Sequence, residues 1–411
     1  MTIVARQISN RPLYALDAHP ASGTIVVGGA DHSLRTLDMH TLELRHELYS
    51  KKFGHREWVT TCCFLGDGQI VSGGMDSVVC LWSAQGTRTS RSAKSIVPCE
   101  HLVDHQGSIS KVLALQDGRS FASASYDSSV KIWGVSRASS APTLLATLIT
   151  PSSSATPAAS SMSSASAATT LQTSPVGSRM PSRPKLTPVL GLALAPQADR
   201  LLAGNGDGVV TVWDLTSMQA VARIAAHRGA VRDLVALGDG NVIVTGGNLD
   251  GCVRMFDLRI PPDKGRGVHK AVDVHGKGGG IVGLAASETA IFTAGGGDGS
   301  VSILDRSLTT IAAARPFDRQ SASPARCPPS PDQIVYALKA TPTGGAVASA
   351  GGGSVALVSP DGSSTLLPRH ESIRNAIRDF WIGSDRLVGC GDDGTVVAVG
   401  IRAWSQPGTT P

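Results

Sequence analysis

The stretch Phe121-Ala-Ser-Ala-Ser-Tyr-Asp127, followed by Val130-Lys-Ile-Trp133, decides the fold of this chain. Two apolar runs flank a short turn that contains Asp and Ser, an arrangement typical of a β-hairpin. The same unit recurs at residues 70–82 and again at residues 201–213. A unit that returns along the chain predicts a repeat architecture rather than a set of unrelated domains.

Seven of these units share one register. Each has an Asp at the turn, and the sixth residue after that Asp is large and apolar. The aspartates are Asp31, Asp76, Asp127, Asp207, Asp250, Asp298 and Asp393, and the apolar residues are Leu37, Trp82, Trp133, Trp213, Phe256, Leu304 and Val399. Another strand candidate lies upstream of the hairpin, such as Val59–Phe64, and a fourth lies downstream, such as Ala220–Ile224. Four short strands per period form one blade of a β-propeller.

The number of blades follows from the number of units. Strand triplets begin near residues 14, 57, 109, 188, 230, 281, 333 and 377. Without the stretch 150–184, eight blades average about 47 residues and seven about 54, against roughly 40–45 for such repeats. We therefore expect eight blades, with seven as the alternative, because the seventh unit has Gly353 and Ser359 where Asp and the large apolar residue are expected. Residues 2–9 predict a further strand that closes the ring by pairing into the last blade.

The unit resembles the Gly-His…Trp-Asp repeat of the WD-repeat β-propeller family. Gly54-His55 with Trp82-Ser83 follows this pattern, and Trp213-Asp214 matches its end. The resemblance covers nearly the whole chain and implies an all-β fold with one continuous propeller domain. We expect residues 1–149 to form the closing strand and blades 1–3, residues 150–187 to form an insert, and residues 188–411 to form blades 4–8. Because this fold hosts many functions, the resemblance predicts the fold and not the activity.

Composition limits the function classes. The 411 residues carry a net charge of only +5, which disfavours a large cationic surface for nucleic acid. No apolar run approaches the roughly 18 residues of a membrane span, and the N-terminus does not resemble a signal peptide. We expect an intracellular, cytoplasmic protein, with nuclear and ciliary locations left open. The seven cysteines lack Cys-x-x-Cys spacing, which predicts neither a disulfide framework nor a zinc site, and no cofactor is expected. The insert 150–187 is rich in Ser, Ala, Thr and Pro and is expected to be disordered.

Ser or Thr, His and Asp recur together in the repeats. Ser, His and Asp are also the parts of a nucleophilic catalytic triad. A catalytic site normally occurs once, whereas this set recurs in several blades and accompanies an aromatic residue, so it resembles the structural tetrad of the family. We therefore expect buried polar networks and no catalytic residues. The expected tetrads are His55, Ser72, Asp76 and Trp82; His105, Ser123, Asp127 and Trp133; and a looser set of His227, Thr245, Asp250 and Phe256, with His275, Thr293 and Asp298 as a further loose copy.

The resemblance also implies one face on which partners dock. Residues beside the hairpin Asp, and those just before the first strand of a blade, would lie on that face near the central channel. The candidate residues are Trp58, Met75, Tyr126, Arg228 and Asp392. Exposed Trp, Tyr, Met and Arg are enriched at protein interfaces. The alternative is that Trp58 and Tyr126 pack against neighbouring blades.

A second candidate surface ends the fifth blade. Phe256, Asp257 and Arg259 resemble the aromatic-Asp-x-Arg box by which some propellers dock on the adaptor of cullin–RING ubiquitin ligases. The neighbouring blade has Trp213-Asp214-Leu215-Thr216, without the Arg. An ordinary arginine at a strand end is the alternative interpretation.

Four serines match short phosphorylation patterns. Ser182 follows Arg179 and precedes Pro184, which is typical of basophilic kinase sites and resembles phosphoserine ligands of 14-3-3-type adaptors. Ser174, Ser323 and Ser330 each precede a proline, as sites of proline-directed kinases do. Such patterns also arise by chance.

These features predict a non-catalytic scaffold or adaptor within a multiprotein complex, regulated by phosphorylation of its insert. Its partners would be other proteins or peptides, with no small-molecule substrate and no membrane span. The first alternative is a substrate receptor that binds a cullin–RING adaptor through Arg259. A further alternative is a subunit of an RNA- or chromatin-associated complex, although nucleic acid is not the expected ligand.

Overall fold

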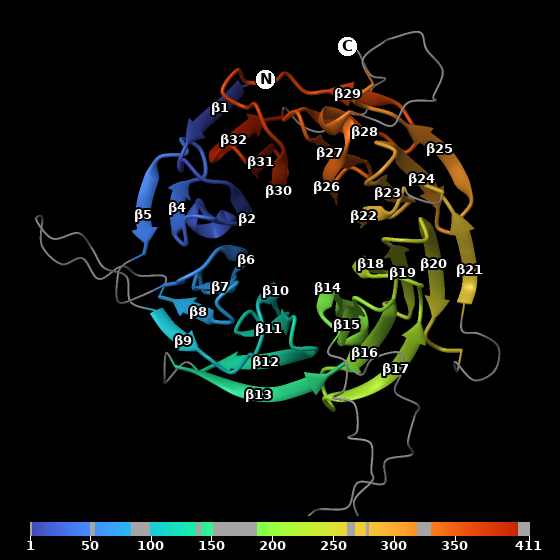
Figure 1. Cartoon of the computed structure of the whole chain (residues 1–411), viewed down its shortest axis with the longest axis horizontal. Coiled ribbons are helices and arrows are strands. Elements are labelled where there is room, and N and C mark those ends of the chain that lie inside the picture. The colour runs from blue at the N-terminus through green and yellow to red at the C-terminus, as the bar shows by residue number, and fades with distance from the viewer. Residues whose placement is uncertain are drawn as a thin grey trace, which may run out of the picture.

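The computed structural model describes residues 2–49, 54–83, 99–136, 141–150, 187–260, 268–276, 279–318 and 330–401. Within these residues the chain forms eight antiparallel four-stranded sheets, arranged as blades around a common axis (Figure 1). In each blade the strands are ordered from the centre to the rim, and short turns join the three inner strands. The outermost strand follows a longer connection in blades 2 and 5, and in blade 8 it comes from the start of the chain. The prediction of eight blades is confirmed, and the alternative of seven is wrong.

The strands of each blade have the following bounds. Blade 1 contains β2 (Leu13–His19), β3 (Thr24–Gly29), β4 (Leu34–Asp38) and β5 (Leu44–Leu48); blade 2, β6 (Val59–Phe64), β7 (Ile70–Gly74), β8 (Val79–Trp82) and β9 (Cys99–Leu102); blade 3, β10 (Ile109–Ala114), β11 (Ser120–Ser125), β12 (Ser129–Val135) and β13 (Pro142–Ile149); and blade 4, β14 (Val189–Ala195), β15 (Arg200–Asn205), β16 (Val209–Asp214) and β17 (Gln219–Ala225). Blade 5 contains β18 (Val231–Leu237), β19 (Val242–Gly247), β20 (Cys252–Asp257) and β21 (Val268–Asp273); blade 6, β22 (Ile281–Ala286), β23 (Ala290–Gly295), β24 (Val301–Asp305) and β25 (Thr310–Ala314); blade 7, β26 (Val335–Ala340), β27 (Ala346–Ala350), β28 (Val355–Val358) and β29 (Ser364–Leu366); and blade 8, β30 (Ile377–Ile382), β31 (Arg386–Gly391), β32 (Thr395–Gly400) and β1 (Thr2–Gln7). In the part of the chain that the structure describes, the short 3₁₀ helices η1 (Pro20–Ser22), η2 (Pro196–Ala198) and η4 (Pro331–Gln333) lie between strands.

The N-terminal strand closes the ring, as expected. β1 pairs antiparallel with β32, from Thr2 opposite Gly400 to Gln7 opposite Thr395. The last blade therefore takes its outermost strand from the start of the chain, and β1 pairs with β32 along its whole length. The two strands lie side by side in Figure 1. This closure removes the unpaired edge that an open array of blades would leave.

The hydrophobic core lies between neighbouring blades. One cluster joins Val26 and Leu34 of blade 1 to Val59 and Trp82 of blade 2, and equivalent clusters follow around the ring. This packing explains why blade 7 forms although it lacks both the Asp and the aromatic residue of the repeat. Its middle strands bury small apolar side chains completely, and the turn residue Gly353 has a φ of +76°, which glycine adopts without strain.

Every innermost strand has a β-bulge near its start. The register of β2 against β3 shifts between Leu13 and Ala15, and the same shift occurs at the same place in the other seven blades. The second residue of each innermost strand is thereby left out of the ladder, which re-aims its side chain. These eight bulge residues are Tyr14, Thr60, Ser110, Leu190, Arg232, Val282, Tyr336 and Arg378.

The insert leaves and re-enters the propeller at one turn. Thr150 donates its backbone N–H and its hydroxyl to the Ser128 carbonyl, and the Thr187 N–H donates to the Ser128 hydroxyl. Ser128 follows Asp127 in the hairpin turn of blade 3. The expectation of disorder concerns residues 150–187. Thr150 and Thr187 are buried and anchored at this turn, and residues 151–186 lie outside the described residues.

Candidate protein-interaction face and polar tetrads

The structure brings together the four side chains of each expected Trp-containing tetrad. In blade 2 the Trp82 Nε1–H donates to the Ser72 hydroxyl at 2.9 Å, and that oxygen lies 2.8 Å from His55 Nε2. His55 Nδ1 lies 3.1 Å from the Asp76 carboxylate. Blade 3 repeats the arrangement with Trp133, Ser123, His105 and Asp127, at 2.9, 2.8 and 2.8 Å.

The chemistry of these groups sets the direction of the hydrogen bonds. An ionised carboxylate can only accept, so the His Nδ1 that faces it carries the proton and donates to Asp. Nε2 of a singly protonated ring then accepts from the serine O–H, and the serine oxygen accepts from the indole N–H. Ser72 and Ser123 are completely buried, and each oxygen is enclosed by its own Trp and His. A substrate therefore has no access to the hydroxyl that a catalytic triad would use.

The carboxylates are held in their charged form. Burial alone would raise the pKa of Asp76, but the hydrogen bond from His55 and the amides of Arg56 and Val78 outweigh it and lower that pKa. Asp127 shows the same balance more strongly, since burial is opposed by His105, by Ser129 and by the Gln106 amide. A depressed pKa means that the folded state stabilises the ionised carboxylate.

The blade 5 set differs from the Trp-containing tetrads. His227 Nε2 lies 2.8 Å from Thr245 Oγ1, and Nδ1 lies 3.1 Å from Asp250, but Phe256 has no N–H to donate. Arg254 donates instead to Asp250 at 2.8 Å and also lies 2.9 Å from His227 Nδ1. Burial lowers the pKa of His227, so its neutral form is favoured beside this arginine. The sequence analysis missed Arg254, although it lies four residues after the turn Asp, where blade 1 has Arg35 paired with Asp31.

Blade 6 repeats the set without an aromatic partner. His275 Nε2 lies 2.8 Å from Thr293 Oγ1, and Nδ1 lies 2.9 Å from Asp298. The polar networks are thus graded around the ring, from full tetrads in blades 2 and 3 to shorter ones in blades 5 and 6.

The candidate docking residues lie around the mouth of the central channel. Trp58, Met75 and Tyr126 are 41%, 46% and 51% exposed. Met75 donates its backbone N–H to the Trp58 carbonyl, so these two residues are adjacent in blade 2. Trp58 also packs on Tyr14 of blade 1, with ring centroids 5.7 Å apart. The packing that we considered as an alternative therefore exists for Trp58, and it leaves a large part of the indole exposed.

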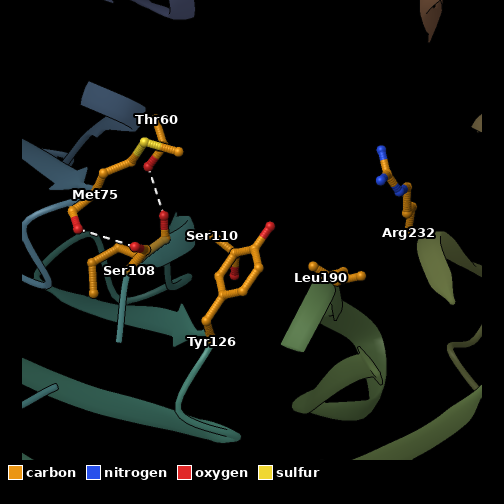
Figure 2. A pocket seen from close by; sticks show the side chains of 8 residues that line it. Thr60, Met75, Ser108, Ser110, Tyr126, Leu190 and Arg232 are labelled. Carbon is orange, nitrogen blue, oxygen red and sulfur yellow. Dashed lines mark hydrogen bonds between the residues drawn. The ribbon is translucent and has the colours of Figure 1, made fainter. Parts of the chain in front are cut away.

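A hollow of about 360 Å³ opens between blades 2 and 5. Met75 and Tyr126 line it on one side and Arg232 on the other, with Leu190 between them (Figure 2). Ser108 fixes the Met75 loop by donating to the Met75 carbonyl at 3.0 Å. The hollow therefore combines apolar side chains with one exposed guanidinium.

A second hollow of about 560 Å³ lies beside Tyr14 and Trp58. Neighbouring blades add a cationic group to this region, because Arg378 stacks on the Tyr336 ring at 4.5 Å and forms a two-pronged ion pair with Asp392 at 2.7 and 2.6 Å. Asp392 is thus a partner of Arg378 rather than a free carboxylate. Arg228 is exposed on blade 5 and lines neither hollow.

The sequence analysis missed the bulge residues of this face. Tyr14, Arg232, Tyr336 and Arg378 each follow the first buried residue of an innermost strand. That register was visible in the sequence, and in a regular strand these side chains would stand perpendicular to the sheet and face a neighbouring blade. Only the bulge, which the sequence does not indicate, turns them toward the channel mouth.

The candidate ligase-adaptor box forms a local ion pair. Phe256 is buried, whereas Arg259 donates Nε and Nη2 to the two oxygens of Asp257 at 2.8 and 2.7 Å. A more distant carboxylate, Asp239, lies 3.7 Å from Arg259 Nη1. The Arg259 side chain is 59% exposed, so it is accessible to a partner.

Of the four predicted phosphorylation sites, Ser330 lies within the described residues. It is exposed and precedes η4, and its N–H and hydroxyl both donate to the Gln333 side chain. Ser174, Ser182 and Ser323 lie outside the described residues.

Comparison with known proteins agrees with this architecture. The family "WD domain, G-beta repeat" matches residues 47–83, 97–134 and 218–257, which are repeats in blades 2, 3 and 5. Over these three repeats the chain is similar to the WD-repeat β-propeller family, and the eight four-stranded blades agree with that similarity. Among solved structures, Sqt1 of Saccharomyces cerevisiae is similar over 97% of this chain and 98% of its own, with a TM-score of 0.71 and 13% identity. Sqt1 of Chaetomium thermophilum, solved bound to the N-terminus of ribosomal protein L10, covers 96% and 98%, with a TM-score of 0.69 and 16% identity. At such low identity these structures establish the fold alone.

Two curated relatives match short parts of the chain. The telomerase protein component 1 of Mus musculus is 25% identical over 122 residues, which is 30% of this chain and 4% of that protein. The DDB1- and CUL4-associated factor 13 of Dictyostelium discoideum is 36% identical over 63 residues, 15% of this chain and 14% of that protein. The matches thus span only a small fraction of these relatives.

The described residues contain no helix with the length and apolar character that crossing a bilayer requires.

Proposed function

We propose that the protein is a non-catalytic interaction scaffold that binds other proteins through the channel-mouth face, defined by Tyr14, Trp58, Met75, Tyr126, Leu190, Arg232, Tyr336 and Arg378. The observation that carries the proposal is the uneven distribution of side chains on equivalent positions of the ring. Large aromatic, Met or Arg side chains lie at or beside the bulge or at the turn in blades 7, 8, 1, 2, 3 and 5, whereas blade 6 has Val282 at the bulge and Gly296 at the turn. A purely structural rim has no need of such asymmetry.

The face has the composition of a peptide-binding surface. Trp58, Met75 and Tyr126 offer exposed apolar area, and rigid aromatic side chains are the usual anchors of interfaces. Within the described residues, no carboxylate pairs with Arg228 or Arg232, which leaves two cations on blade 5. An extended segment with apolar side chains and an acidic residue is the partner that this surface favours. The Sqt1 complex with the L10 N-terminus offers a precedent for peptide binding on this fold.

Affinity capture with paired variants tests the proposal. Tagged wild type is compared with Met75→Ala/Tyr126→Ala and with the control Val221→Ala/Ile311→Ala, which truncates equally exposed apolar side chains on the outer strands β17 and β25. We expect stoichiometric partners in nuclease-treated lysate that are lost from the first variant and kept by the control. Partners that survive in both variants, or that vanish on nuclease treatment of the wild type, would overturn the proposal.

The two described ends of the insert lie close to this face. Because Thr150 and Thr187 are both anchored at Ser128, two residues from Tyr126, charge added at Ser174 or Ser182 remains tethered close to the docking residues. We propose that phosphorylation of the insert modulates partner binding. A binding assay with purified phosphorylated and dephosphorylated protein, and with a variant that lacks residues 151–186, tests this role. Equal affinities in all three would contradict it.

A second candidate function is supported by Arg259. The exposed Asp257–Arg259 pair and the match to a DDB1- and CUL4-associated factor favour a substrate receptor of a cullin–RING ligase. In this case Arg259→Ala should release a cullin adaptor and retain the partners of the channel-mouth face.

We propose a cytoplasmic location, since all six cysteines of the described residues are free thiols, as a reducing compartment permits.

A further inference from the structure

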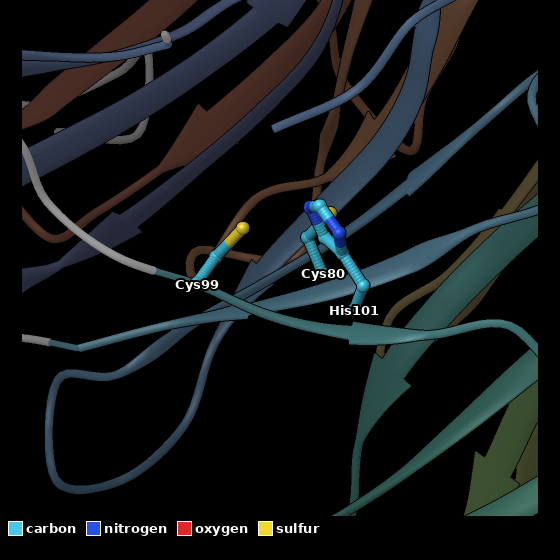
Figure 3. A group of neighbouring side chains, drawn as sticks. All are labelled: Cys80, Cys99 and His101. Carbon is cyan, nitrogen blue, oxygen red and sulfur yellow. The ribbon is translucent and has the colours of Figure 1, made fainter. Parts of the chain in front are cut away.

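Three metal-ligating side chains meet at the outer edge of blade 2. Cys80 lies on β8, and Cys99 and His101 lie on the adjacent strand β9. The register pairs Cys80 directly with His101 and Trp82 with Cys99. Because alternate residues of a strand share one face, residues 99 and 101 both face the same side as Cys80. The cluster therefore follows from the strand pairing itself (Figure 3).

The three groups are close enough to share an ion. The two Sγ atoms and one imidazole nitrogen all lie within 4.8 Å of one another, and no other such group occurs in the described part of the chain. Two thiolates and an imidazole are ligands typical of zinc, which binds them in a tetrahedron. We propose that Cys80, Cys99 and His101 form a binding site for a thiophilic divalent cation, with zinc as the favoured ion. Three protein ligands leave the fourth position for water or an added ligand.

Binding an ion would change the contacts of the free ligands. The Gly54 backbone N–H donates to His101 Nε2 at 3.3 Å, so an ion that bound at this nitrogen would replace that hydrogen bond. Both thiols must also lose their protons on binding, so the affinity of the site for the ion should rise with pH.

Burial around the cluster gives both a rigid base and an entry path. The Cys80 side chain is completely buried against Trp82, whereas Cys99 is half-buried and His101 is exposed. An ion can therefore enter from solvent beside His101 and reach thiols that are fixed by the core. Binding would cross-link β9 to β8 and strengthen the point at which the chain rejoins blade 2. The long sequence separation of Cys80 from Cys99 explains why ligand spacing alone did not indicate a site.

Cobalt titration of the full, chelator-treated protein tests the proposal. Co²⁺ alone should produce a near-ultraviolet thiolate-to-metal charge-transfer band that saturates at one equivalent and is removed by added Zn²⁺. Cys99→Ser and His101→Ala should each weaken Co²⁺ binding by more than the roughly 10–100-fold that changes in outer-shell groups cost. Cys252→Ser is the matched control, because Cys252 is also a partly buried strand cysteine, and it should bind Co²⁺ like the wild type.

Two further measurements keep the outcome decisive. His101→Ala changes an exposed residue, and an unaltered thermal unfolding curve without metal excludes misfolding as the cause of any loss. Zn²⁺ should raise the unfolding temperature of the wild type and leave that of His101→Ala unchanged. The proposal is refuted if no saturable band forms with the wild type. It is also refuted if Cys99→Ser and His101→Ala each give the same band as the wild type. It is also refuted if mass spectrometry of the native protein finds Cys80 and Cys99 joined as a disulfide, which would identify the pair as a redox element.

Discussion

Replacing Asp127 by Asn removes one hydrogen-bond acceptor without changing the shape of the side chain. Asp127 Oδ2 accepts from His105 Nδ1 at 2.8 Å and from the Gln106 N–H at 2.9 Å. Its Oδ1 accepts from the Ser129 N–H at 2.9 Å and the Ser129 hydroxyl at 2.6 Å. In either orientation of an Asn amide, the NH₂ group faces at least one backbone N–H that can no longer be satisfied.

The magnitude follows from these contacts. Hydrogen bonds to a charged group contribute about 1.5–3 kcal/mol each, and an orphaned buried donor costs about 1–3 kcal/mol. Since the Asp127 side chain is only 9% exposed, we expect Asp127→Asn to lower the free energy of unfolding by about 2–4 kcal/mol. Asp117→Asn provides the control in the same blade. Asp117 is exposed, and its Oδ1 accepts from the amides of Arg119 and Ser120. An Asn carbonyl keeps both bonds, so a change within about 0.5 kcal/mol is expected.

Urea denaturation followed by tryptophan fluorescence measures both variants. The free energies are compared by linear extrapolation, with equal slopes as the check that the same structure unfolds. If Asp127→Asn falls within about 0.5 kcal/mol of Asp117→Asn, the tetrad does not stabilise the blade and the structural role that we assign to it is refuted.

Three further predictions follow from the same contacts. The depressed pKa of Asp127 adds stability that is complete above its unfolded pKa of about 3.9 and is lost as pH falls from that value toward the folded pKa. The unfolding temperatures of the wild type and Asp127→Asn should therefore converge below about pH 4, and a gap that is constant with pH would contradict this. The Trp213 indole N–H is buried without a partner among the described residues, because blade 4 has Ala203 where blade 3 has Ser123. Trp213→Phe should therefore lower the free energy of unfolding by about 1 kcal/mol less than Trp133→Phe in urea denaturation, and equal losses would refute the tetrad as the reason. Arg378→Ala should weaken partner binding to the channel-mouth face in a pull-down, because it removes the cation stacked on Tyr336. The control Arg306→Ala changes an exposed arginine that donates to the Ser287 carbonyl and should leave binding unchanged; equal binding by the two variants would count against this part of the face.

The fold was predictable because the repeat encodes it twice. The hairpin turn gives the strand pairing, and the fixed six-residue distance from Asp to a large apolar residue gives the face that is buried. The full tetrads were predictable for the same reason, since Ser, Asp and Trp occur at constant spacing in blades 2 and 3, with a His 17 or 18 residues before the Ser. Blade 7 shows that packing can replace these signals, because small apolar residues such as Ala348 fill the space between its neighbours.

The rest depends on relations that are not local in the sequence. Arg254 enters the blade 5 network through Asp250 and His227 Nδ1, and these contacts are visible only when the side chains are placed together. Cys80 and His101 are neighbours because β9 pairs with β8 after a long connection, and the length of that connection hides the pairing. The channel-mouth face depends on bulges, which insert one residue without a sequence signal of their own.

The bulge position explains how one fold can carry a specific function. Most other residues of an innermost strand are constrained, because their backbone groups pair in the ladder and their side chains pack between blades. The bulge residue belongs to neither, so its side chain can vary at little cost in stability. This freedom is visible in the eight equivalent positions, which range from Ser110 and Val282 to Tyr336 and Arg378. Folding information is therefore concentrated in what the blades share, and recognition in what they do not, which is why the repeat alone predicted the propeller but could not name its partner.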